Sequence, residues 1–235
     1  MRLYRYRKRY IIYVSLFILL ISSSVTNSSV KQKIHLSDKI TLCVPISNLM
    51  ENRLLGWFYG IAGLDVDTDG FTFVFSSQEA AKKIKNYRER YEGVDFELSG
   101  IVSVLGPNWK PMNGKNNDFE NMWYGRGVYK DSAVELDAES NLYIIYPQGV
   151  MEIWDIFTIK PDVNKLPPDD KDEYWLASCY NVHTNAASKK FPSCTMGFHY
   201  KGMAVRSSVT GQNLSVLRDI KSFLLNQLEL WRHCD

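Results

Sequence analysis

The 235-residue sequence has few of the features that usually identify an enzyme. It lacks the GxSxG pattern that places a serine nucleophile on a sharp turn in many hydrolases. It also lacks the CxxC and HxxxH spacings that are typical of metal and redox sites. The Gly125–Gly127 stretch is too short to hold a phosphate group. We therefore predict no catalytic residues and expect a role other than catalysis.

The sequence also lacks an apolar run long enough for a comfortable membrane span. The run Ile11–Ile21 reaches only 16 residues when it is extended to Tyr10–Val25, whereas a helical span needs about 20. Five cations precede this run and small polar residues follow it, a pattern typical of a secretory signal. We expect residues 1–25 to be a signal peptide cleaved near Ser24, or an uncleaved signal anchor. Either way the rest of the chain is exported, so the protein is periplasmic or anchored in the inner membrane with its domain in the periplasm.

The exported part of the chain has no excess of positive charge. The chain carries a net charge of +2, and the five signal cations leave about −3 for the remainder (+2 − 5). A mildly acidic domain has no electrostatic footprint for nucleic acid. It also has no polybasic tract for anionic lipid, so we expect membrane contact only through the N-terminal segment.

Cysteines are few but even in number: Cys43, Cys179, Cys194 and Cys234. In an oxidising compartment four cysteines are expected to form two disulfides. We predict that Cys179 and Cys194 close one local loop and that Cys43 pairs with Cys234, which would join the two ends of the domain. The alternative is a metal site that combines cysteines with nearby histidines.

Alternating apolar and polar residues predict mainly antiparallel strands, and two segments have helical periodicity. The expected fold class is therefore α+β, with each sheet covered by a helix. Ser76 and Glu79 form a capping box at the start of a helix whose apolar face runs to Tyr91. Asn213 is expected to cap the last helix. The apolar stripe of this last helix consists of Val216, Leu217, Ile220, Phe223, Leu224, Leu228 and Trp231. Core packing accounts for the stripe.

The exported part is predicted to begin with a flexible linker over residues 26–40, followed by an α+β domain over residues 41–235. A turn, a strand, two serines and a helix occur twice in this domain, starting at Gly70 and at Gly202. This repeat suggests two related lobes, residues 41–105 and 128–235, separated by a loop over residues 106–127. Chance similarity between hairpins is the alternative.

The segment Asp65–Gly70 matches the start of a calcium loop, with carboxylates at Asp65, Asp67 and Asp69. Alternate carboxylates can turn toward one hard cation, and glycine permits the sharp bend. Ser76 stands where a bidentate glutamate is required, so the segment is not an EF-hand. A polar hairpin turn is the alternative, and calcium is the only cofactor that the sequence suggests.

The long loop before residue 125 is rich in aromatic, methionine and acidic residues. Exposed side chains of this kind are typical of protein-binding hot spots. The predicted partner-binding residues are Trp109, Met112, Asp118, Phe119, Glu120, Trp123 and Tyr124. The alternative is that the same side chains, with Met122, hold the loop against its own core.

A basic signal or anchor, an exported α+β domain of about 200 residues, few cysteines and the ending CTMGFHYKGMAVRSS…IKSFLLNQLELW make up the layout of the chain. This layout resembles the periplasmic immunity proteins that Gram-negative bacteria pair with toxins of type VI secretion or contact-dependent systems. The resemblance implies a protein that binds and neutralises one cognate toxin acting in the periplasm. Two alternatives remain: a metal-dependent extracytoplasmic hydrolase using Asp65, Asp67 or Glu139, and an anchored accessory subunit of the cell envelope.

Overall fold

A computed structural model describes residues 30–50, 65–106, 119–147, 153–168, 174–183 and 190–234. The chain divides into two compact units, Met1–Val30 and Lys31–Asp235, and everything below concerns the second. Its main strands and helices are β1 (Lys31–Ser37), β2 (Ile40–Pro45), η1 (Ile46–Asn48), β3 (Val66–Asp67), β4 (Gly70–Phe75), α3 (Ser77–Lys83), β5 (Arg90–Tyr91), β6 (Val94–Asp95), β7 (Leu98–Val104), α4 (Phe119–Trp123), η2 (Gly127–Tyr129), β8 (Ala133–Asp137), β9 (Leu142–Tyr146), β10 (Ile153–Phe157), β11 (Trp175–His183), β12 (Lys190–Tyr200), β13 (Met203–Thr210), η3 (Gly211–Val216) and α6 (Leu217–Arg232).

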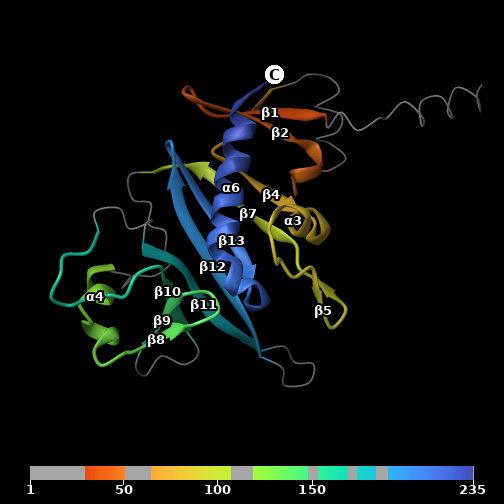
Figure 1. Cartoon of the computed structure of the whole chain (residues 1–235). Coiled ribbons are helices and arrows are strands. Elements are labelled where there is room, and N and C mark those ends of the chain that lie inside the picture. The colour runs from red at the N-terminus through yellow and green to blue at the C-terminus, as the bar shows by residue number, and fades with distance from the viewer. Residues whose placement is uncertain are drawn as a thin grey trace, which may run out of the picture. The chain divides into compact units, whose positions relative to one another are not determined.

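The expected α+β class is confirmed. Eight strands form one sheet in the order β4-β7-β13-β12-β11-β10-β9-β8, and every neighbouring pair in it is antiparallel (Figure 1). A smaller sheet has the order β2-β1-β3, and β5 pairs with β6. β8 and β9 form a hairpin, and Lys201 and Gly202, both of which have positive φ, form the turn between β12 and β13.

The predicted two-lobe division and the linker are both wrong. β4 and β7 come from one proposed lobe and join the strands of the other through β13, so a single sheet crosses the boundary. The region predicted to be a flexible linker contains β1, whose side chains alternate between exposed and buried positions. Ile34 and Leu36 are buried in the core, and their period of two is what makes this short polar segment a strand.

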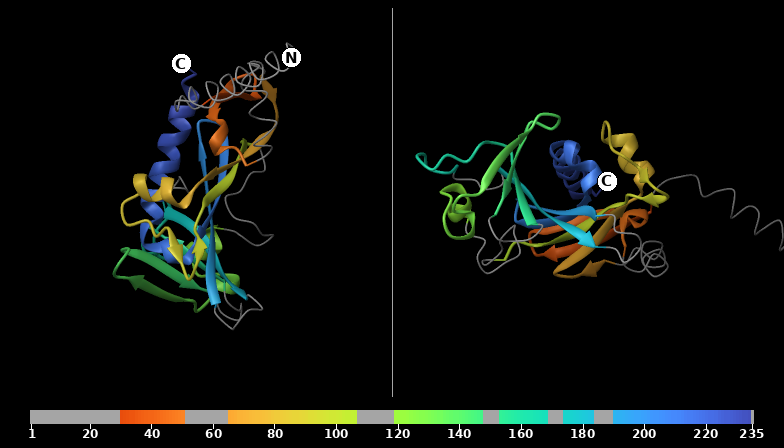
Figure 2. Two further views of the ribbon diagram at one scale, coloured as in Figure 1. Left: turned by 90° about the vertical axis from the view of Figure 1, so that its right-hand side faces the viewer. Right: turned by 90° about the horizontal axis from the view of Figure 1, so that it is seen from below.

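One face of the eight-stranded sheet is covered by α6, and we call it the helix face. The predicted apolar stripe of α6 is confirmed, because all seven of its residues are buried. Trp231 stacks on Phe75 at 5.9 Å between ring centroids and lies edge-on to Phe73 at 6.2 Å. α3 contributes Ala80 to the same core, and Figure 2 shows both helices over this face. Apolar burial of this kind is the main favourable term in folding.

Gly100 lies within β7 and does not interrupt the strand. β7 continues through it, pairing with β4 on one side and β13 on the other. A Cβ atom at this position would collide with the Arg206 carbonyl oxygen and lie 2.6 Å from the ring of Phe73. The glycine is therefore a point of close approach in the middle of the sheet.

The two predicted helix starts differ in outcome. Ser76 caps α3, since its hydroxyl accepts the Glu79 N–H at 3.2 Å. The helix ends at Lys83 and not near Tyr91, which belongs to β5. Asn213 is buried and does not cap α6; its side chain accepts the Arg88 N–H at 2.7 Å and donates to the Arg88 carbonyl at 3.2 Å. It therefore joins the segment after α3 to the approach to α6.

A second, smaller core lies on the face opposite α6, and we call it the opposite-face cluster. Ile145 and Asp155 pair across β9 and β10 and point away from the helix face. A register shift between Ile156 and Phe157 turns Trp175 of β11 toward the same side. The cluster consists of Met122, Trp123, Tyr129, Ile145, Phe157, Tyr174 and Trp175.

Both predicted disulfides are confirmed. Cys179 and Cys194 face each other across β11 and β12, and Cys43 of β2 is joined to Cys234 just after α6. Their sequence separations are 15 and 191 residues, so the second bond connects the two ends of the domain. Two disulfides fit a protein that folds outside the cytoplasm. Over the ranges described, no helix is long and apolar enough to cross a membrane.

Candidate functional site: an acidic cleft beside a histidine network

The small sheet brings the predicted calcium segment against the first strand of the domain. β1 pairs in parallel with β3, so that Ile34 lies opposite Val66 and His35 opposite Asp67. On its other side β1 pairs with β2, where His35 lies opposite Thr41. Lys33 and His35 are two positions apart on one strand and therefore point to the same side of it. Two basic side chains thus face the start of the segment Asp65–Gly70.

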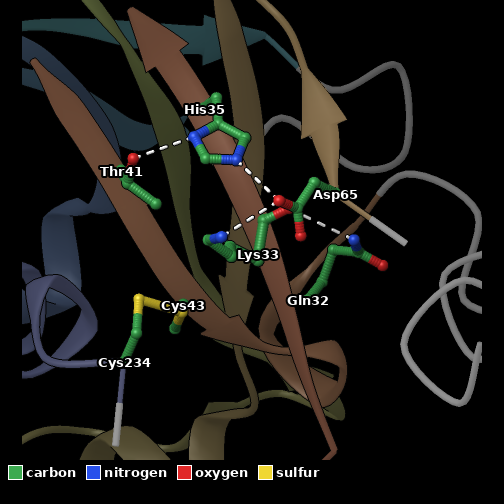
Figure 3. A network of polar contacts seen from close by, with 7 residues as sticks. All are labelled: Gln32, Lys33, His35, Thr41, Cys43, Asp65 and Cys234. Atoms are coloured by element: carbon green, nitrogen blue, oxygen red, sulfur yellow. Dashed lines mark hydrogen bonds and ion pairs between the residues drawn. A yellow bond between two sulfur atoms is a disulfide. The ribbon is translucent and has the colours of Figure 1, made fainter. Parts of the chain in front are cut away.

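These side chains form a continuous polar network, which Figure 3 shows from close by. The Asp65 carboxylate contacts the His35 Nε2 at 2.9 Å and the Lys33 Nζ at 3.0 Å. The His35 Nδ1 lies 2.9 Å from the Thr41 hydroxyl. Hydrogen bonds from His35 and, next, from Lys33 lower the pKa of Asp65 below its usual value. Asp65 is therefore ionised at neutral pH and already has cationic partners.

An open cleft of about 810 Å³ lies next to this network. It is lined by His35, Leu36, Ser37, Asp38, Asp67, Thr68 and Asp69. Asp38 lies in the turn between β1 and β2, and Asp69 lies in the turn before β4. Thr68 fixes that second turn, because its hydroxyl donates to the Gly70 carbonyl at 2.8 Å. The cleft is therefore formed where two tight turns meet beside one strand.

Carboxylates dominate the charge of the cleft. Asp38, Asp67 and Asp69 are exposed, and their side-chain carboxylates make no hydrogen bond or ion pair with another described residue. Lys33 and His35 are already paired with Asp65, whereas Lys39 is exposed beside Asp38 in the turn between β1 and β2. The three carboxylates of the cleft therefore outnumber this lysine, and the cleft keeps an excess of negative charge.

The predicted calcium ligands do not converge. Asp65 is held by Lys33 and His35, whereas Asp67 and Asp69 line the cleft. No group of three or more histidine, cysteine, aspartate or glutamate side chains is placed to hold a metal ion within the described ranges. The arrangement thus agrees with the alternative interpretation of this segment as a polar turn.

The network also resembles, in its order of groups, a hydroxyl–imidazole–carboxylate arrangement used for nucleophilic catalysis. Such a mechanism requires the hydroxyl oxygen to face the space where a substrate binds. Thr41 and Asp65 do not line the cleft, and of the three groups only His35 does. The Thr41 hydroxyl instead makes a cross-strand contact between β1 and β2, so the network is better suited to position strands than to attack a substrate.

The predicted partner-binding loop is only partly described. Trp109, Met112 and Asp118 lie outside the described residues, and Phe119 begins α4. Trp123 is 3% exposed, and its indole N–H donates to the Lys165 carbonyl at 2.7 Å, so its assignment as a partner contact is wrong. The buried indole holds α4 to the opposite-face cluster, as the alternative interpretation proposed.

The two remaining members of this group retain some exposure. Tyr124 is half-buried beneath the Arg126 guanidinium, which lies 4.7 Å from its ring centroid. Glu120 is exposed on the first turn of α4. The described end of the loop is therefore anchored by the buried side chains of Met122 and Trp123.

Sequence reasoning missed Lys33, His35 and Asp38 because residues 26–40 were treated as a linker. The signal that could have found them is the alternation in KQKIHLS, which places apolar residues on one face and cations on the other. The parallel pairing of β1 with β3 could not have been found in this way, since it joins residues about 30 positions apart.

No family model matches this sequence, and the search of curated proteins found no match. Among solved structures, the fold is similar to that of the Neisseria meningitidis iron-regulated outer membrane lipoprotein FrpD. The TM-score is 0.41 and the sequence identity is 9%, over 86% of this chain and 92% of that protein.

Proposed function

We propose that residues 31–235 form an extracytoplasmic protein-binding module whose acidic cleft receives a basic surface of a partner protein. The single observation that carries this proposal is the group of three exposed carboxylates, Asp38, Asp67 and Asp69, that line an open cleft. Complementary charge of this kind accelerates association and selects against acidic partners.

Several further features support a protein partner over a small substrate. The cleft is open and lined by short side chains, whereas small-molecule sites enclose most of the ligand between apolar walls. The exported part is mildly acidic as a whole, which extends the attraction for a basic protein beyond the cleft. The turns that form the cleft belong to a sheet tied to α6 by the Cys43–Cys234 disulfide, so the surface is preorganised.

Within this class the specific role that we propose is immunity: the module binds and neutralises one cognate toxin that acts in the periplasm. This role follows from the layout resemblance described above and from export. In this proposal the domain resides in the periplasm, free or held at the inner membrane by the N-terminal segment.

The test is affinity capture with a matched pair of variants. Residues 31–235, produced in an oxidising compartment, serve as bait for lysate of the source organism and for products of neighbouring genes. We expect one protein to be retained near 1:1, to be released by raised salt, and to lose its toxicity when bound. The double variant Asp67→Asn/Asp69→Asn should weaken retention, because it removes two carboxylates from the cleft.

The control is Glu89→Gln/Glu97→Gln, which removes two exposed carboxylates outside the cleft. Retention by the control should equal that of the unaltered protein. Equal retention by both double variants would contradict the cleft assignment, and retention of a partner whose toxicity persists would contradict the immunity role. A calcium titration monitored by calorimetry then tests the alternative of a metal-dependent hydrolase. That alternative requires the unaltered protein to bind calcium and the Asp67→Asn/Asp69→Asn variant to lose this binding.

A further inference from the structure

The eight-stranded sheet has two edges that differ in how they are protected. The β4 edge is covered, because Leu49 forms a bridge with Phe73 and the Met50 N–H donates to the Thr72 carbonyl at 3.0 Å. At the other edge, β8 pairs with β9 alone among the strands that the structure describes. Unpaired edges attract additional strands, and proteins usually protect them with proline, lysine or a covering segment.

β8 contains neither proline nor lysine, and its sequence AVELD places different side chains on its two faces. Val134 and Leu136 lie on one face and are 40% and 52% exposed. Glu135 alternates with them and points to the other face, where Asp137 follows it. An added strand would therefore meet apolar side chains on one face and carboxylates on the other.

The β8 edge is held in place before any partner arrives. The turn after β8 is closed by the Asp137 side chain, which accepts hydrogen bonds from the Ser140 N–H and from the Ser140 hydroxyl. The Arg218 guanidinium of α6 then donates to the Asn141 carbonyl at 3.1 Å and to the Thr158 carbonyl at 3.2 Å. A strand fixed at both its turn and its inner neighbour loses little conformational freedom on pairing.

Charge decides which strand fits this edge. A second copy of β8 would bring Glu135 and Asp137 against the same two residues, and like charges opposite each other destabilise a strand pair. A segment that alternates basic and apolar residues would instead place its cations beside Glu135 and its apolar side chains beside Val134 and Leu136. Main-chain hydrogen bonds would supply affinity, and the alternate side chains would supply specificity.

We propose that the β8 edge is a docking site for an extended segment of a partner protein in which basic and apolar residues alternate. The site shares no residue with the acidic cleft, so it goes beyond the proposed function and can fail or succeed independently of it. It adds a backbone-directed mode of recognition to a domain whose cleft recognises charge.

The test uses a defined probe, an acetylated and amidated seven-residue peptide of alternating valine and lysine, labelled for fluorescence anisotropy. We expect saturable binding to residues 31–235 and slower amide hydrogen exchange in β8. Glu135→Lys should weaken binding about fivefold to tenfold, since it replaces an attraction by a repulsion. The matched control Glu97→Lys reverses an exposed glutamate away from the edge and should leave the dissociation constant unchanged.

Two further measurements separate strand pairing from simple charge attraction. Two versions of the peptide carry N-methyl groups, one at the odd-numbered residues and one at the even-numbered residues. Only the version whose methyl groups replace the backbone N–H donors that face β8 should lose binding. Leu136→Ser should weaken binding, whereas Asp67→Asn/Asp69→Asn should not change the slowing of β8 amide exchange by the peptide. The proposal is overturned if the unaltered peptide does not bind, or if both N-methylated peptides bind as well as it does. It is also overturned if sedimentation shows a dimer and β8 amide exchange is already slow in that dimer without the peptide.

Discussion

The two ends of the eight-stranded sheet are built on different physical principles. At the β4 end, Trp231 of α6 packs against Phe73 and Phe75 of the strand, and the Cys43–Cys234 disulfide follows the helix directly. At the β8 end, the opposite-face cluster encloses a buried carboxylate, Asp155. The first end is held by apolar burial and a cross-link, which do not titrate. The second combines an open edge with a titratable group, so we expect it to be the end that responds to pH and to partners.

The environment of Asp155 explains this difference. It is 1% exposed; its carboxylate accepts the Tyr129 hydroxyl at 2.9 Å and the Trp175 indole N–H at 3.2 Å. Burial raises the pKa of Asp155 to about 6, although hydrogen bonds from Tyr129, Trp175 and Ser178 oppose that shift. Burial of the Tyr129 phenol, together with the charge of Asp155, raises the pKa of Tyr129 above its ordinary value. The cluster therefore contains one charge that folding has removed from water.

The largest expected effect is at the β4 end and concerns the cross-link. Replacing Cys43 and Cys234 with alanine should lower the free energy of unfolding by about 5 kcal/mol in the chain-entropy model, because the closed loop is long. The same change at Cys179 and Cys194 should cost about 3 kcal/mol from loop closure. Chemical denaturation of both double variants checks the order, and a larger loss from the short loop would contradict it.

The next effect tests the apolar packing at the same end. Trp231→Ala should lower the free energy of unfolding by about 3–5 kcal/mol, because it leaves a cavity between α6 and β4. The loss should not depend on pH between 4 and 7, since the rings that Trp231 contacts, those of Phe71, Phe73 and Phe75, do not titrate. Urea denaturation at several pH values measures it, and a loss that varies with pH would show that the two ends are coupled.

The third prediction concerns the charge at the β8 end. Because the folded-state pKa of Asp155 lies above its ordinary value of 3.8, its contribution to stability is fully present below about pH 4 and is lost as the pH rises through about 6. The loss is on the order of 3 kcal/mol. Asp155→Asn should remove this dependence while it keeps an acceptor for Trp175 and gains a donor for Tyr129.

Denaturation midpoints of Asp155→Asn between pH 4 and 8 check this prediction. Glu97→Gln is the matched control, because that carboxylate is exposed and its removal should leave the pH profile of the unaltered protein in place. An Asp155→Asn profile that keeps the full slope would assign the pH dependence to other groups.

The smallest effect concerns the anchor of α4. Trp123→Phe retains most of the buried ring but removes the hydrogen bond to the Lys165 carbonyl, so it should cost about 1 kcal/mol. The rate of amide hydrogen exchange should increase at residues 119–129 before it increases in the strands that pack on α6. Uniform acceleration across the sheet would show that the opposite-face cluster does not open separately.

Several elements could be predicted from the sequence because their signals are local. The stripe from Leu217 to Trp231 repeats every three to four residues, and β11, β12 and β13 follow one another with short connections. The Ser76 cap depends on a residue three positions away. The pairing of cysteines followed from their spacing and from the need to join the ends of the domain.

The rest could not be predicted because it depends on residues far apart in the chain. Nothing near His35 indicates that Asp65 would lie 2.9 Å from it, since a parallel pair of short strands brings them together. The surroundings of Asp155 require a register shift that turns Trp175 to the same face. Trp123 was assigned to a partner because composition does not distinguish an aromatic side chain that binds outward from one that packs inward.

The sequence by itself determined the α+β class and the apolar stripe of the last helix, because periodicity is a property of the chain. It also predicted the cysteine pairing, but the structure was needed to choose among the three possible connectivities. Only the tertiary structure decided that one sheet replaces two lobes, that Asp65 is paired with Lys33 and His35, and that the β4 edge is covered while β8 pairs with β9 alone in the described part. The physical reason is that strand order and side-chain burial depend on which distant segments compete for the same edge and the same face.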